Sequence, residues 1–388
     1  MLADGAVCLI NETASIIHTI NEKVAAIKSC PHSDQAVMRT VDNRFINCLN
    51  DGKSKDITSA IDDSLSPYRE DLADIRDLIV STDGIAIRTT KNLTYINLEK
   101  NQTMRYAFGS EISMASFGKG RGFARVDDQL WVLATEKTNR ARKANLPDAH
   151  DIKDIVCGPH YTIIQMHDGR IRAHINAYSD PATDADDIYE SVVFPEDEFI
   201  VKIVPGRDSV VYIGLKGTCY YSDVKERHTH SLLNPRPILA LKDYCVEDVS
   251  ITKLAIMVIH DGGRVCMLSM VSESCFNGFY WLEYHLDEYY LDWKKPLHLD
   301  HFDHKPIVSI TPASEHVNPD SERIFFVADD GSVYNGKIEG GNRVGSRTHI
   351  ETVTRIPFFD TRPVAGLHGS RRIKAAARLP TKIALSPT

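Results

Sequence analysis

The chain repeats one degenerate unit along most of its length. Its clearest copy is DIVCGPHYTIIQMHDGRIRAHI, residues 154–175. In this copy an apolar strand leads into a small turn, a second strand follows, and a tight Asp-Gly turn precedes a third strand. Such repeats are typical of solenoids and propellers, in which each unit packs on its neighbours.

Seven copies can be aligned on the turn between the second and third strands. The spacings between these turns are 49, 37, 40, 48, 46 and 68 residues, mostly near the length of a four-stranded propeller blade. A two-residue hairpin turn requires positive φ, which favours Gly or Asn. The turn positions are predicted at Asn43, Asn92, Gln129, Gly169, Gly217, Gly263 and Gly331. An unrelated series of hairpins in a β-sandwich is the alternative, but it does not explain a small-residue turn at one fixed place in each unit.

Composition restricts the class of protein. The 388 residues carry a net charge of −8, which argues against a general nucleic-acid-binding surface. The apolar runs have the length of strands and are too short to span a bilayer. The first residues lack the basic region and long apolar stretch of a secretory signal. We therefore expect an intracellular protein of cytoplasm or nucleus, with no membrane partner.

The repeat resembles that of the regulator of chromosome condensation family. Cys157, Gly158 and the Asp168-Gly169-Arg170 turn match it well, as does the run Asp330-Gly331 with Val333 and Tyr334. The Trp-Gly that ends the family repeat is absent throughout, and the Cys-Gly pair is intact only once. The resemblance implies an all-β fold: one closed β-propeller over residues 1–388, seven-bladed, with eight blades as the alternative if a terminal unit is added. It also implies closure by the two chain ends, for which 364–379 and 3–10 are the candidates.

The largest departure from the repeat is an aromatic-rich insertion between late blades, residues 270–305. Aromatic residues gather there, with acidic residues between them. Tyr and Trp beside charges are typical anchors of protein interfaces, and the alternative is an oversized hairpin that packs on its own propeller. The predicted partner-binding residues are Trp281, Tyr284, Tyr289, Tyr290 and Trp293.

A basic stretch in the third unit is a second candidate contact. It contains Lys137, Arg140, Arg142 and Lys143, which could meet phosphate or an acidic partner or form a solvated loop between blades. The histidines at 298, 301 and 304 lie between prolines and are interpreted as an exposed loop, so no metal site is predicted. The sequence likewise indicates no cofactor and no catalytic motif.

Two classes of function remain open. The first is a non-enzymatic propeller that binds a protein partner, as an adaptor or as a structural component of a larger assembly. The second, implied by the family resemblance, is guanine-nucleotide exchange on a small GTPase. The eroded repeat also fits a fast-diverging lineage, so a viral particle component is a further hypothesis and a virion a further location.

All eight cysteines are predicted to be free thiols. Cys30 and Cys157 occupy the same position of separate units and should lie on different blades, too far apart to pair. Titration with a thiol reagent in denaturant, without reductant, should therefore find every cysteine reactive. Two protected pairs would contradict both the free thiols and the reducing compartment.

Overall fold

The computed structural model describes most of the repeated units. The described residues are 7–10, 16–20, 24–29, 36–40, 42, 44–48, 54–59, 61, 74–81, 83–98, 100, 102–135, 140–175, 189–195, 198–206, 209–224, 232–252, 254–269, 296–300, 302–313, 321–339 and 349–356.

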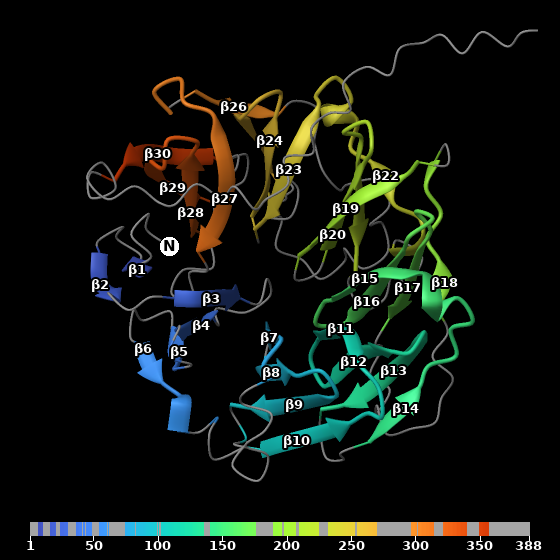
Figure 1. Ribbon diagram of the computed structural model, residues 1–388. Coiled ribbons are helices and arrows are strands. Elements are labelled where there is room, and N and C mark those ends of the chain that lie inside the picture. The colour runs from blue at the N-terminus through green and yellow to red at the C-terminus, as the bar shows by residue number, and fades with distance from the viewer. Residues whose placement is uncertain are drawn as a thin grey trace, which may run out of the picture.

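Seven four-stranded antiparallel sheets follow one another along the chain, and Figure 1 shows them arranged in chain order about a common centre. Each sheet is one blade, numbered 1 to 7. Its strands are called A to D in chain order, with A innermost. All seven predicted units are therefore real blades.

The first four blades cover residues 24–191. Blade 1 contains β3 (Val24–Ser29), β4 (Ala36–Thr40), β5 (Phe45–Cys48) and β6 (Ser54–Asp56). Blade 2 contains β7 (Asp77–Val80), β8 (Gly84–Arg88), β9 (Asn92–Asn97) and β10 (Gln102–Ala107). Blade 3 contains β11 (Ile112–Phe117), β12 (Arg121–Val126), β13 (Gln129–Ala134) and β14 (Ala141–Lys143). Blade 4 contains β15 (Ile152–Cys157), β16 (Tyr161–Met166), β17 (Ile171–Ile175) and β18 (Glu190–Ser191).

The last three blades cover residues 200–355. Blade 5 contains β19 (Ile200–Pro205), β20 (Ser209–Gly214), β21 (Cys219–Asp223) and β22 (Arg236–Pro237). Blade 6 contains β23 (Val246–Ile251), β24 (Ala255–His260), β25 (Arg264–Ser269) and β26 (Leu297–Leu299). Blade 7 contains β27 (Ile307–Ala313), β28 (Ser321–Ala328), β29 (Val333–Glu339) and β30 (His349–Arg355). Two short 3₁₀ helices, η2 (Ala149–Asp151) and η4 (Leu239–Leu241), lie in connections between blades.

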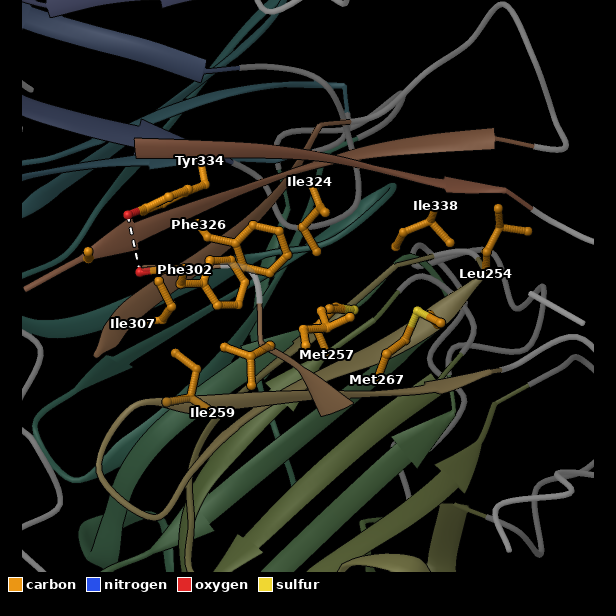
Figure 2. Close-up of a cluster of buried hydrophobic side chains, with 14 residues drawn as sticks. Leu254, Met257, Ile259, Met267, Phe302, Ile307, Ile324, Phe326, Tyr334 and Ile338 are labelled. Atoms are coloured by element: carbon orange, nitrogen blue, oxygen red, sulfur yellow. Dashed lines mark hydrogen bonds between the residues drawn. The ribbon is translucent and has the colours of Figure 1, made fainter. Parts of the chain in front are cut away.

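The core is divided among the interfaces between blades. Strand A of each blade contacts strand A of the next, from β3 through β27. Six buried apolar clusters occupy the six interfaces between consecutive blades. Figure 2 shows the cluster between blades 6 and 7, where Phe302 and Phe326 lie 4.8 Å apart by ring centroids and Tyr334 donates a hydrogen bond to the Phe302 carbonyl. Because truncating one buried Phe costs about 3–5 kcal/mol, these clusters supply most of the stability.

Strand A of six blades carries a register irregularity between its first and third residues. An irregularity of this kind, like a β-bulge, disturbs the regular pairing of the backbone, so polar groups there can accept other partners. In blades 1 to 4, a polar side chain near the end of strand B donates a hydrogen bond to the carbonyl at the equivalent position of the next blade. The donor and acceptor pairs are Arg39 and Ile75 (3.5 Å), Arg88 and Ile112 (2.6 Å), Arg125 and Ile152 (3.0 Å), and Gln165 and Ile200 (2.7 Å).

Blades 5 to 7 hold apolar residues at the donor position. By strand register these are Ile213, Ile259 and Val327. Among the described residues, this particular hydrogen bond, from strand B to the carbonyl of the next blade, is therefore made only by blades 1 to 4. Apolar packing continues through all the described interfaces.

The small turn between strands A and B has a steric cause. A Cβ atom on Gly118 would lie 2.6 Å from the Gly158 carbonyl oxygen, which belongs to the same turn of the next blade. Neighbouring A–B turns thus approach each other too closely for a side chain, and this explains the repeated small residue in the sequence.

The predicted turns between strands B and C are correct where glycine holds the position. Gly169, Gly217, Gly263 and Gly331 have φ between 82° and 99°. The prediction is wrong at Gln129 and Asn92, which are the first residues of β13 and β9. In blade 3, the residues with positive φ are Asp127 and Asp128. In blade 2, the Thr89 hydroxyl closes the turn, because it accepts a hydrogen bond from the backbone amide of Asn92 at 3.0 Å. Asn43 lies outside the described residues.

The chain ends are only partly described. Near the N-terminus, β1 (Val7–Ile10) pairs with β2 (Ile16–Ile20) in a separate two-stranded sheet. Residues 364–379, the predicted partner of the N-terminal segment, lie outside the described residues. Closure through the two ends therefore stays a prediction.

Among the described residues, Cys157, Cys219, Cys245 and Cys266 are free thiols. Burial raises the pKa of Cys157 to about 11 and that of Cys266 to about 12. Both side chains therefore stay as neutral thiols in the interfaces at physiological pH.

The hydrogen bonds between blades can be tested at Arg125, whose guanidinium also donates to the His150 carbonyl at 2.7 Å. Arg125→Ala should lower the free energy of unfolding by about 1.5–3 kcal/mol, because the carbonyls of buried Ile152 and exposed His150 both lose a charged donor. Arg125→Gln, which copies Gln165 of blade 4, should recover part of this loss. Chemical denaturation measures the effect, with Arg264→Ala on an exposed side chain as the control. Equal stabilities of the Arg125→Ala and Arg264→Ala variants would contradict the role assigned to this contact.

Candidate interaction surface

The aromatic residues predicted to bind a partner lie outside the described residues. These are Trp281, Tyr284, Tyr289, Tyr290 and Trp293. Their segment joins the end of β25 at Ser269 to β26, which begins at Leu297 and pairs with β25. The last part of the predicted insertion, which includes His298, thus contributes strand D of blade 6.

The candidate basic contact is not brought together as one surface. Lys137 lies outside the described residues, and Arg140 precedes β14. Arg142 and Lys143 are consecutive residues of β14, so their side chains point to opposite faces of blade 3. Lys143 Nζ lies 5.6 Å from the centre of the Trp131 ring, which in turn makes an edge contact with Phe108.

A different surface gathers exposed apolar side chains. In each blade, the B–C turns and the connections from strand D to the next strand A lie at the same end, here called the B–C end. Of the five large apolar side chains exposed among the described residues, four lie at this end of blade 5 or at its border with blade 4. This blade-5 apolar patch consists of Val193 (61% exposed), Phe199 (40%), Leu215 (53%) and Leu239 (70%).

Backbone hydrogen bonds hold the patch in place. The amide of Leu215 donates to the Phe199 carbonyl at 2.8 Å, which fixes the B–C turn of blade 5 against the start of its strand A. The Phe199 ring lies over Gly169 of blade 4, where a Cβ atom would approach within 2.5 Å. The amide of Val193 donates to the Leu233 carbonyl at 2.8 Å and so links blade 4 to blade 5. The patch therefore spans the border of two blades.

The repeat provides an internal comparison for Phe199 and Leu215. The same amide-to-carbonyl hydrogen bond joins equivalent residues in blades 4, 6 and 7: His167 to Asp151, Asp261 to Cys245, and Asp329 to Pro306. Phe199 thus stands where these blades have Asp, Cys or Pro. Leu215 stands where they have His or Asp.

The remaining patch residues occupy another repeated position. The amides of Ala144, Val192 and Ile238 donate equivalent hydrogen bonds to the start of strand C in blades 3, 4 and 5. The next residue is the polar Asn145 in blade 3, but Val193 in blade 4 and Leu239 in blade 5. The fold itself does not require an apolar residue at this exposed position. Comparing the units position by position reveals the patch once the fold has established which positions are equivalent and exposed.

Charges of both signs adjoin the patch, because Asp243 directly follows Lys242 and Glu198 directly precedes Phe199. Lys216 follows Leu215 and Lys242 follows η4, and both side chains are exposed. Within the described ranges, no carboxylate lies at ion-pair distance from either lysine. Glu198 accepts a hydrogen bond from the Tyr220 hydroxyl at 3.5 Å. By contrast, charges on the innermost strands are paired, as in Lys202 with Asp248 at 2.5 Å and Lys28 with Asp77 at 3.0 Å.

A cluster of three rings anchors strand D of blade 6. His260, fully buried at the end of β24, lies 4.6 Å from Tyr244 and 5.6 Å from His298 by ring centroids. The Tyr244 hydroxyl is 3.1 Å from Nε2 of His298, and Nδ1 of His260 is 3.1 Å from the Asp261 carboxylate. The cluster joins strand B, strand D and the connection that enters the blade.

The described residues hold no group of three or more His, Cys, Asp or Glu side chains with the geometry of a metal site. Over the same ranges, no helix has the length and apolar character needed to cross a membrane.

The fold and repeat define this protein as a seven-bladed β-propeller, and solved structures share this arrangement. The fold is similar to that of Hsv2 from Kluyveromyces lactis, with a TM-score of 0.51 and 9% sequence identity over 86% of this chain and 99% of that chain. It is also similar to Prp20p from Saccharomyces cerevisiae, whose structure was described with its binding to Gsp1p and histones. There the TM-score is 0.48 and the identity 10%, over 74% of this chain and 80% of that chain.

The β-propeller fold that the resemblance to the regulator of chromosome condensation family implies is thus confirmed. No protein-family model matches the sequence, and no curated protein sequence matches it. At these identities the likeness concerns the fold alone.

The buried His260 makes the stability of blade 6 depend on pH. Burial lowers the pKa of His260 below its ordinary value of 6.5, although Asp261 opposes this effect. The unfolded chain therefore binds a proton more readily than the folded one, so this contribution to stability is present above pH 6.5 and is lost as pH falls. His260→Phe keeps a ring and removes the titration. The variant should lose less stability than the original chain between pH 8 and pH 5, as measured by denaturant midpoints. Identical pH profiles would show that another group causes the dependence.

Proposed function

We propose that this protein is a non-enzymatic propeller that binds a protein partner through the blade-5 apolar patch. The observation that carries the proposal is the presence of exposed Phe199, Leu215 and Leu239 at positions that other blades fill mainly with polar or small residues. Exposed apolar groups that the fold does not require are typical of interaction sites. An adaptor or a component of a larger assembly, viral or cellular, would use such a surface.

The aromatic insertion is a second candidate contact. Trp281, Tyr284, Tyr289, Tyr290 and Trp293 have the composition of interface anchors. The strand ends that flank the insertion lie at the end of blade 6 opposite to the B–C end. The two candidates therefore predict contacts at different ends of the propeller, and variants can separate them.

The variants for the patch are taken from the repeat. Leu215→Asp copies Asp261 and Asp329, and Leu239→Asn copies Asn145, so each new residue already occurs at an equivalent site. The double variant should fold, with an unchanged β signal in circular dichroism. It should lose partner binding by about thirtyfold or more, since interface anchors contribute about 2 kcal/mol or more.

Affinity capture with quantitative mass spectrometry compares this variant with the original chain. Leu297→Asp is the matched control, because Leu297 is exposed but lies on blade 6 outside the patch. Proteins lost with the patch variant and retained by the control are the candidate partners. Retention of every captured protein by the patch variant would refute the proposed surface. Loss only with the double variant Trp281→Ala/Trp293→Ala would assign the contact to the insertion instead.

Guanine-nucleotide exchange on a small GTPase is the alternative implied by the family resemblance. Exchange requires tighter binding of the nucleotide-free GTPase than of the loaded form. Release of a fluorescent nucleotide from a panel of small GTPases separates the alternatives. Acceleration by the intact protein would favour exchange over simple binding.

A further inference from the structure

Blade 6 buries an imidazole at a position where five other blades have no titratable side chain. The position is the register partner of the first residue of strand A. In blades 1, 3, 4, 5 and 7 it is held by Thr40, Val126, Met166, Gly214 and Ala328. In blade 6 it is held by His260, which is fully buried. The fold therefore does not require a histidine there.

We propose that His260, Tyr244 and His298 form an acid-sensitive latch. The closed ring cluster holds the first half of β26 against β25, and protonation of His260 opens the cluster. The latch acts within blade 6 and is independent of the contact proposed for the blade-5 apolar patch.

The contacts of His260 define its neutral form. The Asp261 carboxylate accepts a hydrogen bond from the Cys245 amide at 3.0 Å through Oδ1, and its Oδ2 lies 3.1 Å from Nδ1 of His260. A carboxylate that accepts at both oxygens places the imidazole proton on Nδ1. Nε2 then carries a lone pair, and among the described residues this buried atom has no hydrogen-bond partner.

Protonation gives Nε2 an N–H that has no acceptor in the closed cluster. An unmade hydrogen bond and a buried charge both cost free energy. Burial is the main cause that lowers the pKa of His260 below its ordinary value of 6.5; Asp261 raises it, and His298 and Arg264 lower it further. Because the charged ring is better solvated outside the cluster, acid favours the open form.

The titratable and charged groups near His260 come from each element packed against it. Within blade 6 they belong to the turn after His260, to β23, β25 and β26, and to the connection that enters the blade, while blade 5 adds one thiol in the shared apolar cluster. These groups are Asp261, Glu247, Arg264, Cys266, His298, Tyr244, Cys245 and, from blade 5, Cys219. Among the described residues, Asp261 is the one carboxylate at ion-pair distance from His260, and it contacts Nδ1 rather than Nε2.

The first half of β26 depends on the ring cluster. The strand pairs with β25 through three residues, Leu297 to Leu299. Leu299 and Phe302 are buried and fix its C-terminal end, whereas Leu297 is 46% exposed. Between them, Nε2 of His298 lies 3.1 Å from the Tyr244 hydroxyl. Opening the cluster therefore releases the start of β26 and uncovers the edge of β25, which can then pair with another strand.

Amide hydrogen exchange of the full-length chain at a series of pH values tests the latch. After correction for the intrinsic exchange rate, protection of the β25 and β26 amides should fall by about threefold or more between pH 8 and pH 5, because the open form binds the proton more tightly. Strands β13 and β14 of blade 3 are the internal control, since Val126 holds the position of His260 there. Their protection should stay constant.

Two variants separate the parts of the latch. His260→Met copies Met166 of blade 4, so protection of β26 should become independent of pH. Tyr244→Phe keeps the ring and loses the hydroxyl contact with His298, so protection of β26 should be lower at every pH but should still fall in acid.

The latch is overturned if β26 keeps its protection in acid, or if blade 3 or the His260→Met variant shows an equal fall. Unchanged protection in Tyr244→Phe also overturns it. If His260→Met does not fold, an NMR titration of the His260 ring in the original chain decides. A ring that gains its proton over the pH range in which β26 loses protection supports the latch, and a ring that stays neutral during this loss refutes it.

Discussion

The irregular start of strand A sets the relation between neighbouring blades in the first half of this propeller. The irregularity leaves the carbonyls of Ile112, Ile152 and Ile200 able to accept side-chain hydrogen bonds. Arg88, Arg125 and Gln165 of the preceding blades donate to them. Each such hydrogen bond contributes much less free energy than the apolar cluster at the same interface. The hydrogen bond matters for the alignment of neighbouring blades, because its donor and carbonyl must point at each other. Apolar side chains, by contrast, can pack in several registers.

The second half of the propeller relies on apolar contacts alone at this position. Ile213 and Ile259 replace the polar donors of blades 5 and 6. Both surfaces assigned to partner binding belong to these two blades. The blade-5 apolar patch lies at the B–C end, and the strands flanking the aromatic insertion adjoin it at the opposite end. Blades 1 to 4 thus have the more regular polar contacts, and blades 5 and 6 hold the departures from the repeat.

The repeat also serves as a reference for judging single residues. The same backbone hydrogen bond precedes strand A in blades 4, 5, 6 and 7, so the residues that it joins occupy equivalent environments. Asp329 shows that a carboxylate is tolerated where Leu215 lies, and Asp151 shows the same for Phe199. An exposed apolar residue at such a position is therefore not a requirement of folding. This comparison is stronger than exposure alone, because single exposed apolar residues are common on soluble proteins.

The sequence by itself determined the repeated unit, the all-β class and the seven blades, because alternating apolar residues and small turns are local signals. It also located four of the B–C turns, since Gly169, Gly217, Gly263 and Gly331 meet a local need for positive φ. It failed at Gln129 and Asn92, because Asp127, Asp128 and the Thr89 hydroxyl form those turns without glycine. Tertiary structure alone decided which residues act between blades. Arg125 and the Ile152 carbonyl are 27 residues apart, and the sequence pattern of one unit contains no information on a carbonyl of the next. The blade-5 apolar patch likewise became visible only when the fold established which positions are equivalent and which are exposed, since Phe199 and Leu215 look like ordinary core residues in the sequence.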